Sequence, residues 1–105
     1  MPQPSPEQAA KDAAVRMSLL SHGDQGTASR HTLFYFYGGN HRGLGRAAEA
    51  AGFKAGPTVS LDGVILETTM AVDPPSFAPT SARMEAWAEE FGCRYDGWEC
   101  AVVVN

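Results

Sequence analysis

The chain has 105 residues, 44% of them hydrophobic, which is enough for one modest core and indicates a single domain. Twelve acidic residues against eight Lys and Arg give a formal charge of -4, which repels phosphate backbones and disfavours direct binding of nucleic acid. No apolar run approaches the roughly 20 residues of a membrane-spanning helix, so no contact with a membrane is expected. The N-terminal residues show no basic start followed by an apolar run, so no secretory signal is recognised and a cytoplasmic location is expected.

The first predicted element is a helix from Pro6 to about Leu20. Ser5 is a suitable N-cap residue, and Pro6 fits the first helical position because no intrahelical partner is needed for its missing N–H. The residues that recur at helical spacing are Ala10, Ala13, Ala14, Met17 and Leu20. His22, Gly23 and Asp24 are predicted to end this helix.

A strand and a second helix follow. Residues Arg30 to Tyr37 are dense in aromatic side chains and are followed by Gly38-Gly39, which predicts a strand. Asn40 is a good N-cap for the next helix, and Gly52 marks its end. The apolar side of this helix is formed by Leu44, Ala47, Ala48 and Ala51.

Two further strands are predicted over residues 54–61 and 64–70. Asp62-Gly63 between them is a dipeptide preferred in two-residue hairpin turns, because both central residues need a positive φ. The two strands are therefore expected to pair antiparallel. Pro57 cannot donate a ladder hydrogen bond, so the first strand is expected at an edge, whereas Val64-Ile65-Leu66 suits a central strand.

The last part of the chain predicts one helix and one strand. A Pro-rich connection over residues 73–79 is followed by Thr80 or Ser81, either of which can cap a helix that Gly92 ends. Its apolar residues at helical spacing are Met84, Trp87, Ala88 and Phe91. Residues 93–104 then read as a strand, in which Cys93 and Cys100 would lie about 23 Å apart, too far for a disulfide.

The predicted order is a helix followed by βαββαβ, which is the α+β arrangement of a ferredoxin-like fold with an antiparallel sheet. Its strand order would be 4-1-3-2, with the Pro57 strand at an edge. In the first strand, Phe34 and Phe36 share one face, and Leu33, Tyr35 and Tyr37 share the other. One face must pack on the helices; the other is either covered by the N-terminal helix or open to a partner.

Residues that could carry chemistry do not form a recognisable site. Residues 43–48 match the G-x-G-x-x-A pattern of a dinucleotide site, but the preceding strand ends several residues too early and the chain has no room for a doubly wound sheet. His31, His41 and the cysteines lack zinc-ligand spacing. Ser21-His22-Gly23-Asp24 reads as a polar helix end rather than part of a catalytic triad. No catalytic residue, metal or cofactor is expected.

Residues Tyr95-Asp96-Gly97-Trp98-Glu99 have an unusual composition for a strand. Glycine inside a strand marks a bulge or a close backbone approach, and Trp98 is flanked by acidic residues. Two interpretations are equally weighted. Either the segment has a functional role, or Tyr95 and Trp98 simply pack while Asp96 bonds to a backbone amide at a bulge.

The same five residues resemble the Y-D-G-W-E signature of the RraB family, regulator of ribonuclease activity B. Residues 30–36, 47–53 and 86–92 also resemble segments of that family, so the resemblance covers about residues 30 to 104. It divides the chain into an N-terminal helix and linker, residues 1–29, and an RraB-like ferredoxin-like domain, residues 30–105. It also implies a non-catalytic regulator that inhibits the endoribonuclease RNase E by binding its non-catalytic scaffold region and thereby modulates RNA decay.

An acidic face provides a physical mechanism for such binding. The candidate partner-binding residues are Glu85, Glu89, Glu90, Asp96 and Glu99, which could steer a basic segment of RNase E or another RNA-processing enzyme towards the domain. The alternative interpretation of these residues is a solvated surface that maintains solubility. A second functional class stays open, a small-molecule-binding sensor domain. Ferredoxin-like domains often dimerise through their sheets, so a homodimer is also kept as an alternative.

Overall fold

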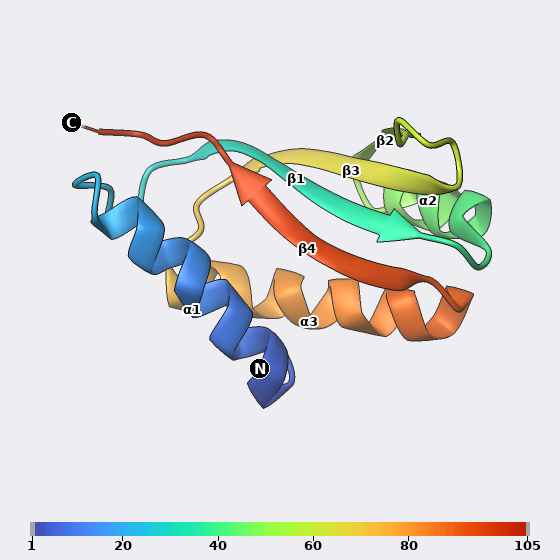
Figure 1. Cartoon of the computed structure of the whole chain (residues 1–105), viewed down its shortest axis with the longest axis horizontal. Helices are drawn as coiled ribbons and strands as arrows, with labels where there is room; N and C mark the ends of the chain where they lie inside the picture. The colour runs from blue at the N-terminus through green and yellow to red at the C-terminus, as the bar shows by residue number, and fades with distance from the viewer. Residues whose placement is uncertain (1, 105) are drawn as a thin grey trace.

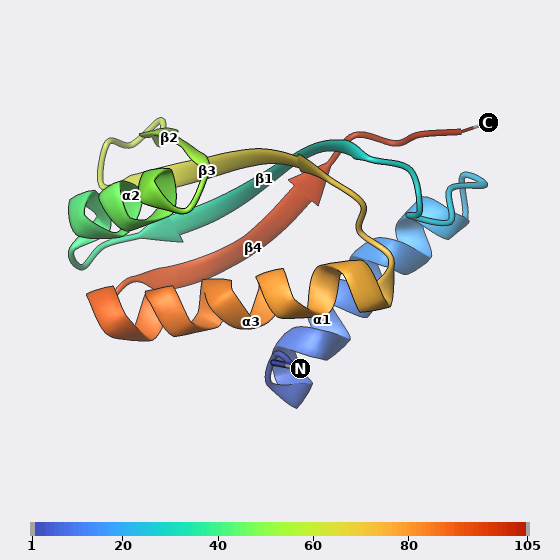
Figure 2. The ribbon, with the colours of Figure 1, turned by 180° about the vertical axis from the view of Figure 1, so that it is seen from behind.

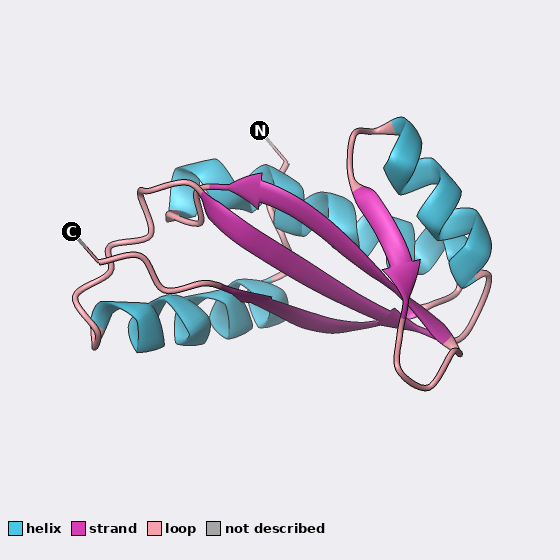
Figure 3. Cartoon of the chain, turned by 90° about the horizontal axis from the view of Figure 1, so that it is seen from above, coloured by secondary structure: helices cyan, strands magenta, loops and turns pink. Residues whose placement is uncertain are grey.

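The computed structural model describes residues 2–104 as one antiparallel sheet with three helices on one of its faces (Figure 1). After the first helix, the element order is β1 α2 β2 β3 α3 β4, and the strand order is β2-β3-β1-β4. The predicted ferredoxin-like α+β fold and its strand order are therefore confirmed. Figure 3 shows the sheet from the side opposite the helices, and none of the helices described covers that face.

Helix α1, Pro6–Leu20, begins where the sequence predicts it. Ser5 is the N-cap, and its hydroxyl accepts a hydrogen bond from the Gln8 amide at 3.2 Å. The side of α1 that packs on the domain differs from the predicted apolar side. Its buried residues are Gln8, Asp12 and Leu19. The apolar residues at helical spacing, Ala10, Ala13, Ala14, Met17 and Leu20, are all exposed.

Strand β1, Arg30–Tyr37, also has its predicted bounds and lies in the middle of the sheet. Phe34 and Phe36 face the helices and are completely buried, whereas Tyr35 and Tyr37 on the opposite face are partly exposed. Helix α2, His41–Ala50, follows with Asn40 as its N-cap and Gly52 at positive φ after its end. This helix packs against β2 and β3 (Figure 2).

The connection between β2, Lys54–Pro57, and β3, Gly63–Met70, differs from the predicted two-residue turn. The strands pair antiparallel with β2 at the edge, as expected, but pairing ends at Pro57 opposite Val64. Residues 58–62 form a longer loop. Gly63 instead belongs to β3, where it pairs with Tyr37 and where an added Cβ would lie 2.1 Å from the Phe36 carbonyl oxygen.

Helix α3, Pro74–Phe91, starts earlier than Thr80 or Ser81, so the predicted cap is wrong. The N-cap is Asp73, and the first-turn prolines Pro74 and Pro75 are compatible with a helix because N–H groups there have no intrahelical partner. Most of the Pro-rich segment that was predicted to be a connection therefore forms the first turns of α3. The predicted end at Gly92 is confirmed, with φ of 67°.

Strand β4, Arg94–Cys100, is shorter than the predicted strand over 93–104. Residues 101–104 leave the sheet, and the Val103 amide donates to the Asp24 carboxylate at 2.8 Å. Cys93 and Cys100 are both free thiols. No helix within residues 2–104 is long and apolar enough to cross a membrane.

The core lies in a single layer between the sheet and the helices. It combines aromatic and aliphatic side chains from β1, β3, α2, α3 and β4, and its largest fully buried members are Phe34, Phe36, Phe77, Leu44, Leu66 and Met84. Phe77 lies in the part of α3 that the sequence had assigned to a connection, and its ring is stacked 6.0 Å from that of Phe34.

Candidate functional site

The segment Tyr95–Glu99 forms a β-bulge in strand β4. Phe34 pairs with Trp98, but Phe36 pairs with Tyr95, so β4 has one more residue than β1 over this stretch. Gly97 adopts a φ of 94°, which a residue with a side chain rarely adopts. Because of the extra residue, Tyr95 and Trp98 both face the helices although they are three positions apart.

Trp98 connects the sheet to the N-terminal helix. Its ring lies 4.2 Å from the ring of Phe77, and its indole N–H donates to Asp12 Oδ1 at 2.9 Å. The Asp12 carboxylate also accepts from Ser81 Oγ at 2.5 Å and from Gln8 Nε2 at 2.8 Å. Asp12 is only 1% exposed, so α1, α3 and β4 meet at one buried, hydrogen-bonded carboxylate.

Tyr95 packs beside this contact. Its ring stacks on Phe36 at 4.9 Å, and its hydroxyl is buried with no hydrogen-bond partner within residues 2–104. Burial raises the pKa of Tyr95 far above its usual value, and the carboxylates of Asp12 and Glu85 act in the same direction. The packing interpretation of Tyr95 and Trp98 therefore has direct support in their contacts.

The candidate acidic residues on α3 have different surroundings. Glu85 is engaged within the molecule, because its carboxylate accepts from the Ser5 amide at 2.6 Å and from the Ser5 hydroxyl at 2.7 Å. Glu89 and Glu90 are exposed on the last turns of α3, and neither forms an ion pair within the described part of the chain.

The two candidate acidic residues on β4 also have partners. Asp96 lies at the bulge and accepts from Arg94 at 2.7 Å, whereas the packing interpretation had placed a backbone amide as its partner. Glu99 lies on the sheet face away from the helices and accepts a hydrogen bond from the Tyr35 hydroxyl. This hydrogen bond, with some burial, raises the pKa of Tyr35 to about 12. The structure thus places Glu99 on a different face from the α3 carboxylates.

The sheet face opposite the helices is a second partly exposed surface of the domain. Leu33, Tyr35, Tyr37 and Ile65 lie on it half-buried, without a helix over them in the described residues (Figure 3). The Arg94 guanidinium lies 5.2 Å from the centre of the Tyr37 ring. Of the two alternatives for this face, the structure shows the open one, since α1 lies on the helical side (Figure 1).

The groups considered for catalysis or metal binding remain dispersed. Within residues 2–104, no three His, Cys, Asp or Glu side chains lie close enough to hold a metal ion. Ser21 Oγ lies 3.3 Å from His22 Nδ1 at the exposed end of α1, whereas Asp24 is engaged by Arg30. Burial raises the pKa of Cys93, which disfavours a reactive thiolate.

Sequence reasoning missed Asp12 and Arg94. Asp12 is an isolated carboxylate in an Ala-rich helix, and its importance depends on Ser81 and Trp98, which are distant in sequence. The only local signal was an acidic residue where the helix would otherwise bury apolar side chains. Arg94 gave no sequence signal beyond its position beside the five-residue signature.

The fold and the bulged last strand define a ferredoxin-like α+β domain in which an additional N-terminal helix docks on the signature tryptophan. The family model described as regulator of ribonuclease activity B matches residues 9–100, and the chain belongs to this family of regulators. The match begins within α1, earlier than the resemblance that starts at about residue 30. The search of curated proteins found no match.

Proposed function

We propose that this protein is a non-catalytic regulator that binds an endoribonuclease of the RNase E type and slows RNA decay. The observation that carries the proposal is the family match, which spans nearly the whole chain. The bulge and the Trp98–Asp12 contact give the Y-D-G-W-E segment a structural role, so its Tyr, Gly and Trp are not part of the proposed contact surface.

The end of α3 is the proposed contact for a basic segment of the ribonuclease. Glu89 and Glu90 are exposed and form no ion pair within residues 2–104, so they can approach Lys and Arg side chains without first breaking such a pair there. Asp96, also exposed, lies shortly after the end of this helix. Glu85 is less suited to direct contact with the ribonuclease because its carboxylate already accepts two hydrogen bonds from Ser5.

The test is a pull-down of purified RNase E and a cleavage assay on an RNA substrate. Glu89→Gln with Glu90→Gln should weaken retention about tenfold and weaken inhibition in parallel, because two charge-assisted contacts are lost. Glu7→Gln with Glu49→Gln is the matched control, since it changes the net charge equally at exposed sites on α1 and α2. If wild-type protein neither binds nor inhibits RNase E, the proposal is wrong.

A second candidate function, small-molecule binding, is favoured by one specific observation. A hollow of about 460 Å³ lies between α2 and the loop that connects β2 to β3. This volume falls in the range of ligand pockets, roughly 300–1,000 Å³.

A further inference from the structure

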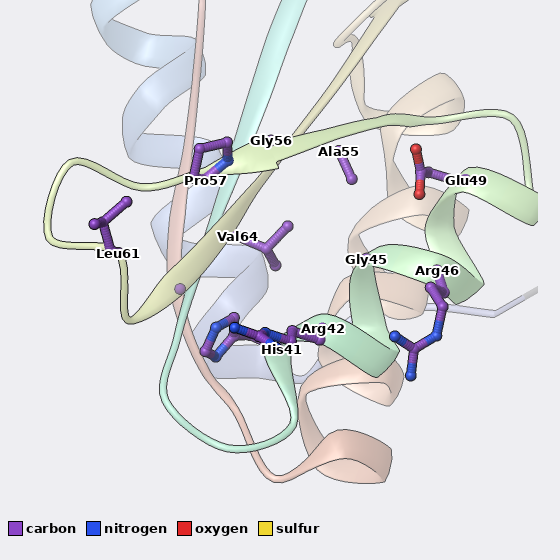
Figure 4. Close-up of a pocket in the computed structure, with 11 residues that line it drawn as sticks. His41, Arg42, Gly45, Arg46, Glu49, Ala55, Gly56, Pro57, Leu61 and Val64 are labelled. Carbon is purple, nitrogen blue, oxygen red and sulfur yellow. The ribbon is translucent and has the colours of Figure 1, made fainter.

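The hollow beside α2, named here the α2 pocket, has walls of contrasting chemistry (Figure 4). One wall is α2, which contributes His41, Arg42 and Arg46 together with Gly45 and the carboxylate of Glu49. The opposite wall comes from β2, the following loop and the start of β3, and it is mainly apolar. Its residues are Ala55, Gly56, Pro57, Leu61, Gly63 and Val64.

The α2 wall carries two arginines against one carboxylate, Glu49, so its net charge is positive. Arg42 and Arg46 are one helical turn apart, both are exposed, and neither forms an ion pair within residues 2–104. Like charges at this spacing repel each other. This concentration is notable in a chain with a net charge of -4.

The position of Arg42 in α2 adds to the unfavourable electrostatics. Arg42 lies in the first turn, where a cation opposes the helix dipole, and that turn has no acidic residue to offset it. The helix end itself is already capped, because Asn40 Oδ1 accepts from the Gly43 amide at 3.0 Å. An anion in the pocket would therefore be bound by the arginine side chains and would relieve their repulsion.

The apolar wall is a formed surface. The Leu61 amide donates to the Thr58 carbonyl at 3.1 Å, and the Gly38 amide donates to the Asp62 carbonyl at 2.8 Å, so both ends of the loop are held. Leu61 has a φ of 64°, unusual for a branched side chain, and remains 74% exposed at the pocket. An apolar ligand body would cover this side chain.

We propose that the α2 pocket binds a small organic anion. Its carboxylate, phosphate or sulfonate group is held by Arg42 and Arg46, and its apolar body packs on Leu61 and Val64. The site shares no residue with the acidic surface at the end of α3, so it does not depend on ribonuclease binding.

The test uses 8-anilinonaphthalene-1-sulfonate, an apolar aromatic anion, as the probe. Fluorescence titration should show saturable binding, and NMR amide shifts should change in α2 and residues 56–64. Arg42→Gln with Arg46→Gln should weaken binding about tenfold or more, because two charge-assisted contacts are lost. N-phenyl-1-naphthylamine, which lacks the sulfonate, should bind more weakly and be insensitive to the same substitutions.

Two further variants keep the result interpretable. Lys11→Gln with Arg83→Gln makes the same change in net charge outside the pocket and should leave probe affinity unchanged. Leu61→Asp places a carboxylate on the exposed loop and should weaken probe binding without threatening the core. Absence of saturable binding, shift changes centred on the open sheet face, or equal affinity in the arginine variant would each overturn the proposal.

Discussion

At the residue scale, a buried ion pair joins the start of β1 to the loop after α1 and to the segment after β4. Arg30 donates to the two Asp24 carboxylate oxygens, each at 2.8 Å, and both residues are 3% exposed. Asp24 also accepts from the amides of Gly26 and Val103. The carboxylate therefore holds together the loop after α1, the first residue of β1 and the segment after β4.

Asp24→Asn should destabilise the protein by about 2–3 kcal/mol at neutral pH, because the buried Arg30 then loses its anionic partner. Hydrogen bonds from Arg30 hold the pKa of Asp24 well below its usual value. The unfolded chain therefore takes up this proton first as pH falls. The stabilisation is complete above about pH 4, the usual Asp pKa, and is lost at lower pH.

Urea unfolding across pH checks this expectation. The difference in unfolding free energy between wild type and Asp24→Asn should shrink as pH falls below about 4. Asp62→Asn, at an exposed carboxylate whose side-chain partner is the Ser60 hydroxyl, should show a smaller difference at neutral pH. A constant difference for Asp24→Asn from neutral to acid pH would contradict the assigned role.

At the element scale, the docking of α1 depends on Trp98. Trp98→Phe keeps an aromatic ring against Phe77 but removes the indole N–H that donates a hydrogen bond to Asp12. The free energy of unfolding should therefore fall by about 1–3 kcal/mol. Hydrogen exchange should accelerate in α1 more than in β1. Trp87→Phe is the control, because Trp87 is half-buried and its ring packs on Phe53, which follows α2. Equal effects of both substitutions, or unchanged exchange in α1, would contradict this role.

Elements with strong local signals were predictable. The aromatic run of β1, the Asn40 cap and the Gly92 end all depend on residues adjacent in sequence. The start of α3 was missed because consecutive prolines resemble a connection, although they also fit a first helical turn. The inner side of α1 was missed because Asp12 is satisfied by Ser81 and Trp98, contacts that sequence periodicity does not encode.

The candidate site was predictable only in part. The glycine in β4 correctly predicted a bulge, since positive φ strongly favours this residue. The acidic residues were grouped by sequence proximity, which cannot reveal that Glu85 holds Ser5 or that Glu99 faces away from the helices. The α2 pocket was missed because its walls come from α2, β2, the start of β3 and Leu61 in a loop whose length was predicted wrongly.

At the scale of the whole molecule, the unequal distribution of charge should control how fast a basic partner associates. The net charge of -4 favours long-range attraction of such a segment, and on the proposed function Glu89 and Glu90 would give this attraction a local centre. The two contributions can be separated, because Glu7 and Glu49 contribute equally to net charge but lie on other helices.

Raising NaCl from about 0.1 M to about 1 M shortens the Debye length from about 10 Å to about 3 Å and should therefore slow association with RNase E. Stopped-flow measurements should show that Glu89→Gln with Glu90→Gln has a flatter salt dependence of the association rate than wild type. Glu7→Gln with Glu49→Gln, which has the same net charge, should retain a slope close to that of wild type. Equal slopes for the two double variants would mean that net charge alone steers the encounter and that the end of α3 is not its centre.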